Sequence, residues 1–378
     1  MDLFSRTSDH FGYYTVCNQK TYSKFEAIKL HKKTGGHPEW HYHDEIFSSY
    51  DWTQEPTQSL DSLYKKRAEQ LREKYDYIVL FYSGGADSTN VLDTFINNNI
   101  HLDEIATFHQ YTGNKNRTTF TDGEITNVAM PRIQQLKESH PHIVHRSIDR
   151  TPIVYNYFKD LNNAESFIYS QSINMAACNV RNRIFEYEKF YKDSILNGKN
   201  ICFLWGVDKP RLLHDNGRFN FRFLDILDGS VVPGTTAPVE FFYWSPDLPE
   251  LIIKQAHIVK RYLENSDASS RFIFQNTGGY LAGRKVGDQT LWLSNDGVHS
   301  LIYPTWDINT FTAGKAPSSI ISPGSRWFIT LGETDQSLAN WKSVMQHWWQ
   351  EIPEYWRNDP NDVLRGVKGC FSKPYFLN

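Results

Sequence analysis

An apolar stretch that runs directly into a glycine turn and then into a helix is the feature that most constrains this chain. Residues 77–82 are apolar or aromatic, residues 83–88 read Ser-Gly-Gly-Ala-Asp-Ser, and a helix is predicted over residues 89–97. Glycines permit a sharp turn and let an anion approach the backbone N–H groups, while the start of a helix favours negative charge. The segment therefore predicts a strand–turn–helix unit that binds phosphate.

The turn itself contributes the main candidate residues for binding a nucleotide and its cation. These are Ser83, Gly84, Gly85, Ala86, Asp87 and Ser88. The serine hydroxyls are hydrogen-bond donors to phosphate, and Asp87, which would repel a bare phosphate, indicates a bridging Mg²⁺. The alternative is a plain strand-to-helix turn in which Asp87 or Ser88 caps the helix. The turn is not a Walker loop, because it has no G-x-x-x-x-G-K-[ST] pattern and no lysine.

The Ser-Gly-Gly-Ala-Asp-Ser turn resembles the S-G-G-x-D-S signature of the PP-loop ATP pyrophosphatases, the adenine nucleotide α-hydrolase-like superfamily. That group includes asparagine synthetase and, in variant form, phosphoadenosine phosphosulfate (PAPS) reductase. The resemblance covers the turn closely and residues 60–265 more loosely. It implies an enzyme that uses Mg²⁺ and ATP, cleaves ATP to AMP and pyrophosphate, and adenylylates a substrate oxygen for amide, amine or sulfur transfer.

Apolar strands alternate with helices from residue 59 to residue 265. Strands are predicted at 77–82, 104–109, 142–148 and 200–205, and helices at 59–75, 124–139, most of 152–197, and 248–264. This order predicts an α/β fold with a doubly wound, mostly parallel sheet, whose ligands bind at the carboxyl ends of the strands. Residues 1–58 are then an N-terminal extension and residues 266–378 an aromatic-rich C-terminal α+β accessory region.

Three further structural expectations depend on local patterns. In the helix at 59–75, the charged residues, Arg67 among them, are expected on the solvent face. Pro131 should kink the helix at 124–139 or start a second piece. The alternating stretches at 219–224 and 239–244 suggest a hairpin.

A second candidate site follows the strand at 200–205. Gly206 allows close approach of a ligand, Asp208 could hold Mg²⁺ through water, and Lys209 or Arg211 could neutralise charge on the α-phosphate and the leaving pyrophosphate. The alternative is a solvated turn opened by Pro210. In PP-loop enzymes a basic residue after a later strand often contacts phosphate, and Lys209 is similar in placement.

Weaker candidates lie elsewhere along the chain. By the same resemblance, the backbone at Thr107, Phe108 and His109 would read the adenine edge, against the alternative of a plain core strand. Arg181 or Arg183 could bind a phosphate or a substrate carboxylate, although an exposed helix face explains them equally well. Glu240 is a candidate to border the second substrate.

Composition restricts the partners more than it identifies them. The net charge of −3 over 378 residues gives no argument for nucleic acid, although a local patch is not excluded by it. No apolar run is long enough for a membrane span, and the four scattered cysteines favour a reduced, cytoplasmic location. The histidines at 37, 41 and 43 are expected to be hydrogen-bonded or exposed rather than metal ligands.

The sequence thus favours an AMP-forming ligase or transferase whose acceptor is a small molecule or a nucleobase. Two alternatives stay open at this point. A PAPS-reductase-like oxidoreductase would need Cys370, whose Lys-Gly-Cys-Phe context matches the reductase motif poorly. A nucleotide-binding module without catalysis would keep the turn and lack turnover.

Overall fold

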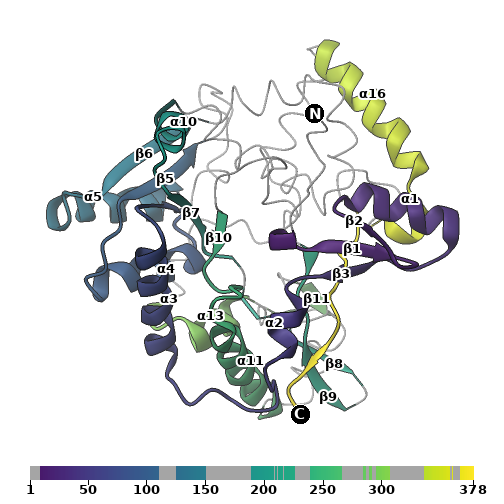
Figure 1. The fold of residues 1–378 in the computed structure, drawn as a ribbon, viewed down its shortest axis with the longest axis horizontal. Coiled ribbons are helices and arrows are strands. Elements are labelled where there is room, and N and C mark those ends of the chain that lie inside the picture. The colour runs from purple at the N-terminus through teal and green to yellow at the C-terminus, as the bar shows by residue number, and fades with distance from the viewer. Residues whose placement is uncertain are drawn as a thin grey trace.

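The computed structural model describes most of the chain between residues 9 and 378 (Figure 1). The described residues are 9–109, 125–149, 189–207, 209–210, 212–215, 217–225, 239–265, 284–286, 289–291, 295–306, 336–357, 360 and 367–378. None of the helices in this part of the chain is both long and apolar enough to cross a bilayer.

A five-stranded sheet with all strands parallel is the largest sheet of the described residues and is called the central sheet below. Its strands are β4 (Tyr77–Phe81), β5 (Glu104–His109), β6 (Val144–Asp149), β7 (Ile201–Trp205) and β10 (Val239–Phe241). Every residue of β4, β7 and β10 is buried, because strands covered on both faces are apolar throughout. The predicted α/β fold around a parallel sheet is confirmed.

The order of the strands is β10-β7-β4-β5-β6. The chain builds outwards from β4 to β6 and then returns to the other side of β4, so the order reverses between β4 and β7. Right-handed crossovers then place the helices that follow β4 and β5 on one face and the helix before β7 on the other. Figure 1 shows α10 across the strands from α3 and α4. In such sheets the reversal point is where ligands bind.

The helices around this sheet agree with most of the predicted boundaries. They are α3 (Leu60–Lys74), α4 (Ala86–Asn97), a π-helix (Ile125–Ala129), α5 (Met130–Ser139), α10 (Lys189–Leu196), α11 (Pro249–Glu264) and α13 (Asn295–Ile302). Ser59 caps α3 by accepting a hydrogen bond from the Ser62 amide. Pro131 stands in the first turn of α5, so the predicted second piece is confirmed.

The remaining described elements come from the N-terminal segment, from residues 212–221 and from the C-terminal segment. They are a 3₁₀ turn (Asp9–Phe11), β1 (Tyr13–Val16), β2 (Gln19–Thr21), α1 (Lys24–Thr34), β3 (Glu39–His41), α2 (Asp44–Ser48), β8 (Leu212–Asp215), β9 (Arg218–Phe221), β11 (Arg284–Val286), β12 (Gln289–Leu291), α16 (Gln336–Glu351), a second 3₁₀ turn (Glu354–Trp356) and β13 (Tyr375–Phe376). The Trp52 ring stacks on Phe221 and Tyr375, with centroids 5.2 and 4.7 Å apart. The domain boundaries at 58 and 265 stay predictions.

Three expectations are wrong. The helix after the turn begins at Ala86 and not at residue 89, so Asp87 lies in its first turn. The hairpin is absent from the described residues: β9 pairs with β8 and β13, whereas β10 joins the parallel sheet beside β7. Arg67 is fully buried and does not face solvent. Of the helical stretch predicted at 152–197, residues 152–188 lie outside the described part.

Candidate functional site

The turn after β4 is shaped by glycine and by two serine hydroxyls. Gly84 has φ of 81°, a left-handed conformation that glycine adopts without strain, and Gly85 is the N-cap of α4. Ser83 Oγ accepts from the Gly85 amide at 3.2 Å. Ser88 Oγ accepts from the Ser83 amide at 3.3 Å and donates to the Gly85 carbonyl at 3.1 Å. Ser83 is exposed, whereas Ser88 is buried and serves the turn itself.

Asp87 is held by donors from distant parts of the chain. Lys209 Nζ lies 3.2 Å from Oδ2, the Tyr303 hydroxyl donates to Oδ1 at 2.6 Å, and His299 Nε2 lies 3.5 Å from Oδ1. The Tyr243 hydroxyl donates to the Asp87 backbone carbonyl at 2.8 Å. The Asp87 carboxylate is therefore ordered and is not a free, solvent-facing loop group, although 28 % of its side chain is exposed.

These donors keep Asp87 ionised. Burial by itself raises the pKa of the carboxyl, but the Lys209 ammonium, the nearby His299 imidazole and the hydrogen bond from Tyr303 outweigh it, so the pKa lies well below its ordinary value. The position in the first turn of α4 favours the same charge state, because helix N-termini attract negative charge. A charged carboxylate and an ammonium thus stand side by side at the reversal point of the sheet.

Gly206 brings the end of β7 against the start of α4. A Cβ at this position would lie 2.9 Å from the Asp87 carbonyl oxygen and 3.0 Å from the Ser88 Cα. The sequence predicted that Gly206 leaves room for a ligand. In the structure the backbone of α4 occupies that room. The missing side chain at residue 206 lets Lys209, which is 8 % exposed, reach Asp87 across the two strands. Asp208 and Arg211 lie outside the described residues.

The predicted adenine-reading strand is present as β5. Thr107 is buried and its hydroxyl lies 2.9 Å from His145 Nε2. Phe108 is half-buried, with its ring centroid 5.0 Å from that of Phe81. His109 ends the strand, and its side chain lies outside the described part, as do Arg181 and Arg183. Contact of this strand with a nucleotide stays a prediction.

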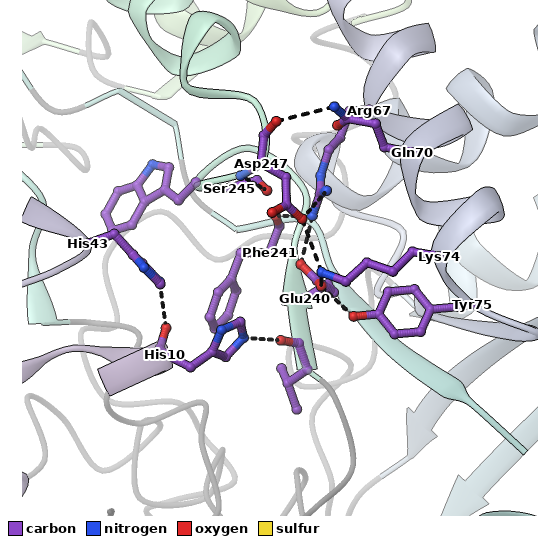
Figure 2. A network of polar contacts seen from close by, with 12 residues as sticks. His10, His43, Arg67, Gln70, Lys74, Tyr75, Glu240, Phe241, Ser245 and Asp247 are labelled. Carbon is purple, nitrogen blue, oxygen red and sulfur yellow. Dashed lines mark hydrogen bonds and ion pairs between the residues drawn. The ribbon is translucent and has the colours of Figure 1, made fainter. Parts of the chain in front are cut away.

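Glu240, on β10, lies in a buried polar network with side chains of α3 and with Asp247 (Figure 2). Its carboxylate accepts from Arg67 Nη2 at 2.8 Å, from Lys74 Nζ at 2.9 Å and from the Tyr75 hydroxyl. Asp247 adds a second carboxylate, 3.1 Å from Lys74 and 3.4 Å from Arg67. Burial raises the pKa of Glu240, but Arg67, Tyr75 and Lys74 lower it to about 2. With its oxygens occupied in this way, Glu240 is arranged as a structural group.

The described residues contain no group of three or more histidine, cysteine, aspartate or glutamate side chains that could hold a metal ion by themselves. His41 lies 2.8 Å from both Thr15 Oγ1 and Asp44, and His43 lies 2.8 Å from the His10 carbonyl, as expected for hydrogen-bonded histidines. Among the described residues, Asp87 therefore has no partner carboxylate, cysteine or histidine cluster for a cation, and a bound substrate or water would supply further ligands.

Cys370 is buried in the C-terminal segment, beside Asp225. Its backbone amide donates to Asp225 Oδ1 at 3.0 Å. Burial, and then the nearby Asp225 charge, raise the pKa of the thiol to about 12. The thiol is protonated and inaccessible at neutral pH, which is the opposite of a reactive cysteine.

Comparison with known proteins assigns no family to the chain, so the proposed function depends on the geometry of the candidate site. No protein-family model matches the chain, and no curated protein matches it significantly. The sequence singled out the turn, Asp87 and Lys209 as candidate residues, and the structure brings these three together. The sequence-based prediction missed the donors Tyr243, His299 and Tyr303, for which no local signal exists, since Tyr303 is 216 positions from Asp87.

Proposed function

We propose that the chain is an ATP-dependent enzyme of the PP-loop type. It binds Mg·ATP at residues 83–88, releases pyrophosphate and transfers AMP to an oxygen of an acceptor. One observation carries this proposal: the glycine turn lies at the reversal point of a parallel sheet, with the ionised Asp87 paired to Lys209. The strand order itself supports a sheet of the adenine nucleotide α-hydrolase-like type.

The turn offers the pyrophosphate portion of ATP several donors. Glycines 84 and 85 let phosphate oxygens approach the backbone, the start of α4 adds N–H groups, and the exposed residue Ser83 adds a hydroxyl. Ser88 stabilises the shape of the turn through its hydrogen bonds with the Ser83 amide and the Gly85 carbonyl. Thr107, Phe108 and His109 would lie beside the adenine, and Asp208, Arg211, Arg181 and Arg183 complete the proposed set of ligand contacts, while Gly206 acts by letting β7 approach α4.

Asp87 fits a magnesium ion that arrives with the nucleotide. Mg²⁺ is typically bound by one or two carboxylates together with substrate phosphates and several waters. Asp87 is ionised, supplies hard oxygen atoms and is partly exposed. When bound, the ion would offset the negative charge of the phosphates.

The chemistry requires positioning and charge stabilisation more than a side-chain nucleophile. An acceptor oxygen attacks the α-phosphorus, the bond from the α-phosphorus to the bridging oxygen breaks, and pyrophosphate leaves. Lys209 is placed to stabilise charge that grows during this step. A nitrogen or sulfur nucleophile then displaces AMP from the adenylylated acceptor. The proposed acceptor is a small molecule or a nucleobase.

The reductase alternative is weakened by Cys370. A thiol whose pKa is raised to about 12 and that is 4 % exposed cannot serve as the essential nucleophile without rearrangement. A module that binds nucleotide without turnover differs from the proposal only in kinetics. The experiments below separate the two.

The test compares two isosteric variants of α4. Asp87→Asn removes the charge at the turn, whereas Asp93→Asn removes a carboxylate on the same helix that pairs with Arg132 at 2.8 Å. Asparagine is preferred to alanine because Asp87 is held by hydrogen bonds and its complete removal would disturb the fold. We expect Asp87→Asn to lose Mg²⁺-dependent ATP binding and pyrophosphate release, and Asp93→Asn to keep both. Retention of both in Asp87→Asn would contradict the site.

A further inference from the structure

The segment 295–306, in the region predicted to be accessory, lies against the helix that follows the turn. The Thr305 hydroxyl donates to Asp93 Oδ2 at 3.0 Å, and the Ile302 carbonyl accepts from the Tyr64 hydroxyl at 2.6 Å. Between these two contacts, the Tyr303 hydroxyl reaches Asp87. The segment is therefore fixed to both α3 and α4 around the candidate site.

The Tyr303 ring has little freedom to move its hydroxyl away from Asp87. Tyr303 is 3 % exposed. Its ring centroid lies 5.6 Å from that of Tyr243 and 5.4 Å from that of His299, which is stacked on it. A hydroxyl carried by a ring packed in this way is preorganised, because its rotamer is set before any ligand binds.

The two oxygens of Asp87 receive their donors from different elements. Oδ1 accepts from Tyr303, with His299 beside it, and Oδ2 faces Lys209. A donor at each oxygen fixes the plane of the carboxylate. A carboxylate has about four acceptor positions, so the hydrogen bonds from Tyr303 and Lys209 leave room for a cation contact.

We propose that Tyr303 is a positioning residue that orients the Asp87 carboxylate for magnesium nucleotide, and that residues 299–303 form a wall of this site. The inference rests on the proposed function. It assigns to the C-terminal region a part of the nucleotide site that the turn cannot supply, namely the hydroxyl that holds the cation-binding carboxylate in place.

Two substitutions in the same segment test this assignment. Tyr303→Phe removes the hydroxyl on Asp87 and keeps the ring. Thr305→Val removes the hydroxyl on Asp93, which also lies on α4, and leaves Asp87 untouched. Calorimetric titration with ATP is performed on the full chain in Mg²⁺ and in EDTA, after thermal unfolding has established that each variant is folded.

We expect Tyr303→Phe to weaken Mg·ATP binding by roughly tenfold or more, the scale for losing a hydrogen bond to a charged group. Its affinity for ATP in EDTA should be close to that of the wild type, because the hydroxyl acts through the carboxylate. Thr305→Val should match the wild type under both conditions.

The outcomes distinguish this inference from the proposed function. If the wild-type protein binds Mg·ATP and Tyr303→Phe binds it equally well, the positioning role is refuted while the proposed function stands. Equal losses in both variants, or an equal loss with and without Mg²⁺, would also refute it, because they indicate general disturbance of the segment. A wild-type protein that binds no nucleotide overturns the proposed function and this inference together.

Discussion

Replacing Glu240 with glutamine removes one negative charge from the buried network of Figure 2 and keeps the size of the side chain. Arg67, which is fully buried, then loses its main counter-ion, and Lys74 and Tyr75 lose a charged acceptor. If Glu240 is structural, the variant should lose stability. If it borders the second substrate, as the sequence suggested, the variant should instead lose turnover at unchanged stability.

The expected loss can be worked out in two ways. The pKa of Glu240 is about 2 in the folded protein against an ordinary 4.5. That difference of about 2.5 pKa units, at about 1.36 kcal/mol each, corresponds to roughly 3 kcal/mol at neutral pH. Independently, removing one partner of a buried ion pair costs about 3–5 kcal/mol. Glutamine still accepts hydrogen bonds, so about 3 kcal/mol is expected.

The assay is thermal unfolding at pH 7, where about 3 kcal/mol should lower the midpoint by about 4 °C, given an unfolding entropy of about 2.1 cal/mol/K for each of the 378 residues. Asp247→Asn is the matched control, because Asp247 contacts the same Arg67 and Lys74 but its side chain is 41 % exposed. It should cost less than about 1 kcal/mol. The KM for ATP should be unchanged in both variants.

The pH dependence of the unfolding midpoint provides a second test of the Glu240 charge. Because the folded-state pKa of Glu240 is depressed, its contribution is present above about pH 4.5 and is lost as the pH falls towards 2. The difference in midpoint between wild type and Glu240→Gln should therefore shrink over that interval. The structural role would be refuted if Glu240→Gln had the same unfolding midpoint at pH 7 as the wild type. It would also be refuted if the difference between the two midpoints did not change with pH.

Three further substitutions probe the candidate site and its surroundings. Lys209→Ala should lower kcat by roughly 100-fold with a smaller effect on ATP affinity, because the ammonium stabilises charge that grows during the reaction; unchanged steady-state kinetics would exclude that role. Gly206→Ala should abolish ATP binding measured by calorimetry, since its Cβ would lie 2.9 Å from the Asp87 carbonyl oxygen, and wild-type affinity would show that the turn tolerates displacement. Cys370→Ser should keep pyrophosphate release within a few-fold of the wild type, because the thiol is protonated and buried, and loss of activity in a folded variant would favour the reductase alternative.

Strands β4 and β7 could be predicted from the sequence because strands buried on both faces are continuously apolar, and β5 because its apolar residues lie between predicted helices. The predicted strand at 104–109 agrees with β5 at both ends, and those at 77–82 and 200–205 differ from β4 and β7 by one residue. Their pairing partners carry no such signal. Alternation at 219–224 and 239–244 found strands but suggested the wrong pairing, because a local pattern does not specify the neighbouring strand.

Two incorrect predictions, the start of α4 and the exposure of Arg67, have identifiable causes. The helix after the turn was expected too late because Asp87 and Ser88 are typical capping residues, whereas the observed N-cap is Gly85, which has no side chain. Arg67 was expected in solvent because of its charge. Its spacing of four from Leu63 and Leu71, which are both buried, would have placed it on the core-facing stripe of α3.

Formation of AMP and pyrophosphate from Mg·ATP tests the central claim most directly. ATP labelled at the α-phosphate is incubated with the full chain, Mg²⁺ and a panel of metabolite and nucleic-acid acceptors. The proposed function predicts label in AMP or in an adenylylated acceptor, one pyrophosphate for each AMP, and loss of both products in Asp87→Asn or in EDTA. Label that accumulates in ADP, or ATP that binds at the turn and is recovered intact with every acceptor, would contradict it.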